Sequence, residues 1–189
     1  MGILGLCEWS AITPGMVATD AMLKRAPVEV LETGPIDPGR YLTVLTGELA
    51  CVEEAVAAGV ASGAANVVRS AVLANLHPAV LAAVRGDAEP PAHDAVGIVE
   101  TSDTVAAVCA ADMACKAAPI MPMTLHLARH IGGKGYFVFA GALPDVEAAE
   151  EAARAEAGPA LVDARVIAQP DDAFFQELSR PSRLRKGHA

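Results

Sequence analysis

Two copies of one short motif hold the most regularly spaced charged groups in this 189-residue chain. Asp20 stands four residues before Lys24 in DAMLKRAP, and Asp112 stands four residues before Lys116 in DMACKAAP. Residues four apart lie on one face of a helix, so each carboxylate can pair with its lysine for about 0.3–0.5 kcal/mol. Taken alone, the spacing predicts two surface ion pairs rather than an acid–base site.

The thiols and imidazoles form no recognisable metal motif. The four cysteines are Cys7, Cys51, Cys109 and Cys115. None belongs to a CxxC pair or to a zinc-type Cys/His spacing, and we interpret them as structural thiols in a reducing cytosol. His126 and His130 alternate along one expected strand, so three copies around an axis would offer a metal site. A simple hydrogen-bonded role for both histidines is the favoured alternative.

Enzyme signatures are missing from the sequence. There is no P-loop, no GxSxG, no HExxH and no dinucleotide fingerprint. The glutamates of two Ala-rich segments are interpreted as solvated helix faces; they are Glu53, Glu54, Glu147, Glu150 and Glu151. A net charge of −9 argues against general nucleic-acid binding. No apolar run reaches the roughly 18 residues of a membrane span, and the N-terminus lacks a signal peptide's basic start.

The elements that position these groups occur twice along the chain. Ile3–Glu8 matches Ala95–Glu100 at the same offset of 92 residues that separates the two motifs (112 − 20). From Gly47 and Gly141 onward the offset is 94 (141 − 47). A single two-residue insertion between collinear matches indicates a duplicated domain, because repeats of solenoids are only about 20–50 residues long. We expect a first domain at 1–84, a linker at 85–94, a second domain at 95–178 and a basic, disordered tail at 179–189.

Each repeat predicts the same order of elements: strand, helix, strand, strand, helix, strand and short helix. In the first repeat these span 3–8, 14–25, 28–32, 41–47, 48–63, 66–74 and 77–84, and in the second 95–100, 104–117, 123–128, 136–141, 143–158, 160–168 and 171–178. Pro27 and Pro119 end the first helix of each repeat, since proline blocks helix continuation. We therefore expect two small α+β sandwiches, each with helices over one sheet.

The motifs LGLCE, DAMLKRAP, GPIDPGRYLTVLTG and VLANLHPAV, followed by VGIVE, DMACKAAP and HIGGKGYFVFAG, resemble two fused bacterial microcompartment shell domains. The resemblance covers 3–84 and 95–178, and the leading first strand matches the unpermuted tandem class. It implies a structural shell protein without catalysis, whose homotrimer forms a pseudohexameric disc with a central pore for small metabolites. It also implies a location in the cytoplasmic microcompartment, where such discs tile facets beside shell hexamers and pentamers and enclosed enzymes are further partners.

The resemblance assigns an edge role to the repeated motif. Lys24 and Lys116 would lie along the rim of the disc and pack against their counterparts on a neighbouring tile. Asp20 and Asp112 would stand beside them as part of the same interface.

The resemblance also assigns a pore role to the turns at 35–40 and 130–135. The implied pore-lining residues are Ile36, Asp37, Pro38, Gly39, Arg40, Ile131, Gly132, Gly133 and Lys134. Glycine suits such a place because it tolerates close backbone approach and positive φ. Ordinary hairpin turns in a globular protein would explain the glycines equally well.

Asp37 departs from the family pattern. Members from propanediol-utilising compartments carry a cysteine in this turn, through which three copies hold an iron–sulfur cluster. A carboxylate is a hard ligand unsuited to such a cluster, so we expect no cofactor, and an iron–sulfur electron-transfer role is kept only as the alternative. Three Asp37 carboxylates would instead make an acidic pore that favours neutral or cationic metabolites, unless Arg40, His130 or Lys134 reverses the local sign.

Overall fold

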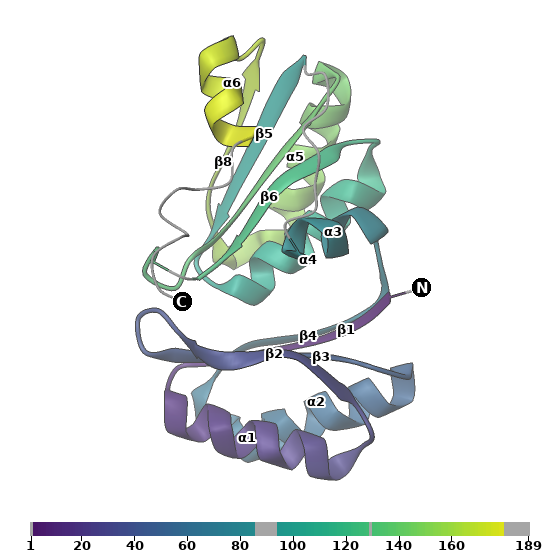
Figure 1. Cartoon of the computed structure of the whole chain (residues 1–189), viewed down its shortest axis with the longest axis vertical. Coiled ribbons are helices and arrows are strands. Elements are labelled where there is room, and N and C mark those ends of the chain that lie inside the picture. Colours follow the sequence, from purple (N-terminus) through teal and green to yellow (C-terminus); the bar gives the residue numbers. More distant parts are fainter. Residues whose placement is uncertain (1, 86–93, 129, 180–189) are drawn as a thin grey trace.

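Two four-stranded antiparallel sheets organise the chain in a computed structural model that describes residues 2–85, 94–128 and 130–179 (Figure 1). The first sheet has the order β2-β3-β1-β4 and the second the order β6-β7-β5-β8. The strands are β1 (Gly2–Trp9), β2 (Glu29–Ile36), β3 (Arg40–Thr46), β4 (Val67–Leu76), β5 (Ala95–Thr101), β6 (Met121–Leu127), β7 (Gly135–Gly141) and β8 (Leu161–Ala168). The two sheets have identical topology, which confirms the duplicated domain.

Within the described residues, six α-helices follow the predicted positions in both repeats. They are α1 (Ile12–Arg25), α2 (Leu49–Gly63), α3 (Pro78–Arg85), α4 (Thr104–Ala117), α5 (Leu143–Ala157) and α6 (Asp172–Ser179). A short 3₁₀ turn follows α2 (Ala64–Asn66) and another follows α5 (Gly158–Ala160). None of the helices in the described ranges has the length and apolar character needed to cross a bilayer.

The second strand of each repeat is longer than expected. β2 continues through Pro35 to Ile36, where the sequence predicted an end at Glu32. Proline removes a ladder donor and is tolerated mainly at a sheet edge, which is where β2 lies. Most of the predicted linker and tail falls at 86–93 and 180–189, outside the described residues.

Alternation along β1 separates two apolar surfaces. Cys7 and Trp9 point to one side and pack with Met22 of α1 and Val52 of α2. Leu4 and Leu6 point to the other side, which we call the outer face of the sheet because its own domain's helices α1 and α2 do not cover it. The second sheet is built alike, with α4 and α5 against its inner face.

The outer face of the first sheet is covered by the second domain. Helix α4 lies across β1 and β4, so Leu6 and Val108 share one apolar cluster (Figure 1). The facing side of α4 is rich in alanine, and these small side chains allow helix and sheet to approach closely. Helix α3 leaves its own domain and packs against β6 and α4. We call this contact of the first sheet and α3 with the second domain the domain joint.

Candidate functional site: the domain joint and the glycine turns

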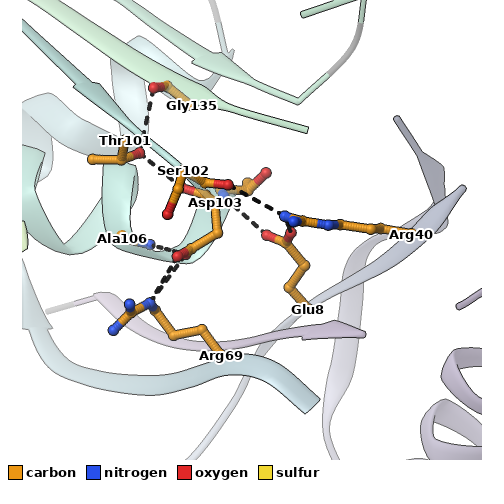
Figure 2. Close-up of polar contacts among 9 residues, drawn as sticks. Glu8, Arg40, Arg69, Thr101, Ser102, Asp103, Ala106 and Gly135 are labelled. Atoms are coloured by element: carbon orange, nitrogen blue, oxygen red, sulfur yellow. Dashed lines mark hydrogen bonds and ion pairs between the residues drawn. The ribbon is translucent and has the colours of Figure 1, made fainter. Parts of the chain in front are cut away.

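Glu8 is the central polar group of the domain joint. Its side chain is fully buried on the outer face of β1 and accepts a hydrogen bond from Arg40 Nη1 at 2.7 Å. It also accepts one from the backbone N–H of Thr104 at 2.8 Å, at the start of α4 (Figure 2). Burial raises the pKa of Glu8, whereas the hydrogen bonds from Arg40 and Thr104 lower it. Glu8 thus ties the first sheet to the electropositive N-terminus of α4.

A second ion pair crosses the joint beside Glu8. Asp103 caps α4 by accepting a hydrogen bond from the backbone N–H of Ala106 at 2.8 Å. Arg69 of β4 approaches the same carboxylate through Nε, at 3.0 and 3.1 Å from its two oxygens (Figure 2). One carboxylate therefore fixes the start of α4 and its position over the first sheet.

The two copies of the charged motif occupy different surroundings. Asp112 is buried, pairs with Lys116 and accepts a hydrogen bond from the backbone N–H of His77 at 2.7 Å, just before α3. Asp20 pairs with Lys24 on the exposed surface of α1. Both i, i+4 pairs expected from the sequence are therefore formed, and one of them also belongs to the domain joint.

The two glycine turns of the chain meet each other. Gly39, Gly132 and Gly133 have φ values of 103°, 67° and 84°, the left-handed region that favours glycine. A Cβ atom on Gly133 would lie 2.7 Å from the carbonyl oxygen of Asp37 and 2.9 Å from Cδ of Pro38, closer than contact distance allows. The turn after β6 therefore lies directly against the turn after β2.

The cations next to these turns have carboxylate partners. Arg40 pairs with Glu8, and Lys134 pairs with Glu100 at 2.7 Å. The two pairs occupy equivalent positions in the two repeats. Ile36 is buried in the apolar cluster of the joint, while Asp37 remains partly accessible.

The thiols lie away from both turns. Cys7, Cys109 and Cys115 are buried, and burial raises the pKa of each thiol to about 12, while Cys51 is half-buried on α2. An iron–sulfur cluster needs thiolate ligands, so the residues of the turns do not fit one. Within the described ranges no three His, Cys, Asp or Glu side chains are grouped to hold a metal ion. The ring of His126 stacks on that of Tyr136, with centroids 5.2 Å apart.

Sequence reasoning did not identify the polar groups of the joint. Glu8 was visible only as a match to Glu100, and Asp103 only as a residue ahead of a predicted helix, where aspartate is a common cap. Arg69 carried no local signal at all. Glu8 contacts Thr104, and Asp103 contacts Arg69, across the two domains, so no local spacing along the chain connects these partners.

Comparisons with known proteins agree on one family. The BMC domain model matches residues 4–76 and 95–170. The chain is 40% identical to the bacterial microcompartment shell protein PduT of Citrobacter freundii over 177 residues, covering 93% of this chain and 96% of that protein. It is also similar to a crystal structure of a microcompartment protein from Desulfitobacterium hafniense, with 34% identity, a TM-score of 0.80 and coverage of 93% and 99%. A fused permuted shell protein of the RMM microcompartment shares the fold, at 20% identity and a TM-score of 0.62 over 82% and 80% of the two chains.

Proposed function

The chain belongs to the bacterial microcompartment shell proteins, with two BMC domains in tandem, and we propose that three copies close into a pseudohexameric tile. Its role is structural, as a component of the microcompartment shell. In the proposed tile, six contacts between domains follow one another around the ring. Three are the domain joints within the chains, and three are equivalent contacts between the second domain of one chain and the first domain of the next. The tile has a central pore, catalyses no reaction, and packs beside other shell proteins around enclosed enzymes.

The difference between α1 and its repeat α4 carries the proposal. Met16 and Val17 of α1 are 52% and 58% exposed, whereas the equivalent Val108 and Cys109 of α4 are 0% and 8% exposed. The side of α4 that corresponds to this exposed face is covered by the first sheet of its own chain. Burying the same face of α1 requires a sheet from a second copy, since exposed apolar patches mark interaction sites.

The outer face of the second sheet is a suitable partner for α1. Val96 and Val138 occupy the positions that Leu4 and Val44 occupy in the domain joint. Glu100, the counterpart of Glu8, stands where it can accept the N–H at the start of the neighbour's α1. These two different surfaces make a heterologous contact, which gives a closed ring when the rotation per copy completes a circle.

The glycine turns support a pore at the centre of this ring. Because the two turns of one chain touch each other, ring closure would bring the turns of all three chains around one axis. Arg40 and Lys134 are paired with glutamates, so Asp37 is our candidate for the charge that faces passing molecules. We propose an acidic constriction that passes small neutral or cationic metabolites more readily than anions.

Lysines of the repeated motif would connect one tile to the next. Lys24 is exposed, and Lys116 keeps part of its side chain accessible beside buried Asp112. We assign these two lysines to the tile edge, with Asp20 and Asp112 holding them in place as i, i+4 partners.

Electron microscopy of the purified chain tests the tile. We expect class averages of a threefold disc with a central hole, and a Val17→Asp variant should lose the discs because the charge would be buried against the neighbouring sheet. Leu49→Asp is the control, since Leu49 is also an exposed apolar residue but lies on α2, which packs against the inner face of the first sheet and away from the proposed contact. Discs that survive Val17→Asp, or particles with twofold symmetry, would contradict the proposal.

A further inference from the structure

Helices α3 and α6 are equivalent in the two repeats but lie in different places. Their bounds, Pro78–Arg85 and Asp172–Ser179, coincide at the offset of 94 residues (172 − 78). Helix α3 crosses the domain joint to pack on β6 and α4, while α6 folds back over the sheet of its own domain (Figure 1).

The position of α6 coincides with the surface that ring closure requires. Phe175 and Leu178 of α6 pack on Val96, Val138 and Ala140 of the second sheet's outer face. The equivalent face of the first sheet is occupied by α4. In the proposed ring, α1 of the next copy needs this surface, so α1 and α6 compete for it.

We infer that α6 is an exchangeable cover: it shields the outer face of the second sheet in the isolated chain, and moves onto the neighbouring copy when α1 of that copy docks. This inference rests on the proposed ring. After the exchange, α6 lies on β2 and α1 of the neighbour, as α3 lies on β6 and α4 within the chain. Assembly thereby replaces one apolar contact of α6 by another, and the outer face of the second sheet is covered in both states.

Two adjacent phenylalanines give α6 one apolar face for its position in the isolated chain and another for its position in the ring. Phe175 is buried against the chain's own sheet, whereas Phe174 is 44% exposed. The equivalent of Phe174 in α3 is Val80, which is 0% exposed in the domain joint. Phe174 is thus exposed although the equivalent residue of α3 is buried. Its exposure is explained if α6, after assembly, packs on the neighbouring copy as α3 packs on the second domain.

Matched serine variants at these two positions distinguish an exchanging helix from a fixed one. We expect Phe174→Ser to raise the concentration at which trimers dissociate by about tenfold or more, as truncation of a buried aromatic anchor does at interfaces. Phe175→Ser should not weaken the trimer in this way, because it removes a contact that exists only in the isolated chain. Mass photometry over a dilution series gives both values, with circular dichroism as the control for folding.

Cysteine variants report the burial of the same positions directly. In Phe174→Cys, we expect the new thiol to react rapidly with iodoacetamide in dilute monomer and to be protected in trimer, followed by peptide mass spectrometry. If wild-type chains form trimers but the residue 174 thiol reacts equally fast in both states, the inference is wrong while the ring survives. Trimers weakened by Phe175→Ser but not by Phe174→Ser would lead to the same conclusion. A wild-type chain that never trimerises would instead refute the proposed ring itself.

Discussion

Replacing Glu8 with alanine tests the domain joint at its most buried polar contact. The substitution removes the acceptor for two donors, Arg40 Nη1 at 2.7 Å and the backbone N–H of Thr104 at 2.8 Å. Thr104 lies in the buried joint, so its N–H is left without a partner, and the guanidinium of Arg40 is left partly buried.

The size of the effect follows from burial. Breaking a buried ion pair by removing one partner costs about 3–5 kcal/mol, and the partial accessibility of Arg40 places the Glu8→Ala variant at about 3 kcal/mol. For a chain of 150–250 residues each kcal/mol corresponds to about 2–4 °C, so we expect the melting temperature to fall by about 6–12 °C.

Glu100 provides the matched control because it occupies the equivalent position in the second repeat. In the isolated chain it forms only a half-exposed pair with Lys134, worth about 0–1 kcal/mol. Glu100→Ala should therefore leave the melting temperature of the monomer nearly unchanged. In the ring it removes an acceptor at every joint between chains, at about 1–3 kcal/mol per joint, so trimers should dissociate at much higher protein concentration.

Two measurements separate these effects. Differential scanning calorimetry of dilute, monomeric protein reports the domain joint, and light scattering over a concentration series reports the joints between chains. Equal melting temperatures for wild type and Glu8→Ala would refute the role of Glu8. Trimers of Glu100→Ala as stable as those of wild type would refute the equivalence of the two kinds of joint.

Four further outcomes are expected. Lys24→Ala combined with Lys116→Ala should abolish sheets in electron micrographs while leaving the mass of the tile unchanged, and persistent sheets would exclude these lysines from the edge. In shells assembled with Asp37→Ala, the uptake of a cationic dye relative to an anionic dye of equal size should fall, and an unchanged ratio would remove Asp37 from the pore. Iodoacetamide should label Cys51 alone in the native chain and all four cysteines in denaturant, because burial raises the pKa of the other three thiols to about 12. Labelling of any other cysteine in the native chain would contradict the burial of these thiols. Burial raises the pKa of Glu8 above its ordinary value of 4.5, so the contribution of Glu8 to folding is full below that pH and falls as the pH rises through the folded pKa. In urea titrations, Glu8→Gln should therefore destabilise the chain more in acid than at neutral pH. A larger destabilisation at neutral pH would refute the raised pKa.

Local sequence signals were sufficient for the elements of the fold. The collinear repeat, the prolines after α1 and α4 and the glycine turns gave the order of strands and helices in both domains, and all three turn glycines expected at positive φ have it. These features depend on residues close together in the chain. The edge strand β2 was predicted to end at Glu32 and residues 35–40 were assigned to a turn, whereas β2 continues through Pro35 to Ile36, because an edge position tolerates proline.

Tertiary placement accounts for what the sequence did not reveal. The helix at 77–84, which is α3, was predicted correctly as a helix. Its sequence pattern did not indicate that it would pack on the other domain. Likewise, Arg40 was considered a free charge of the pore turn, because its partner Glu8 is 32 residues away in sequence. The difference in exposure between α1 and α4 appears only once the first sheet is seen to cover α4.

The mass of the native particle tests the central claim most directly. Native mass spectrometry at micromolar concentration should give a particle of three chains, each of 19.3 kDa, in which the exposed face of α1 is buried against the second sheet of the next copy. A particle that keeps the mass of one chain at all accessible concentrations, or that stops at two, would contradict a ring closed by repeating the domain joint.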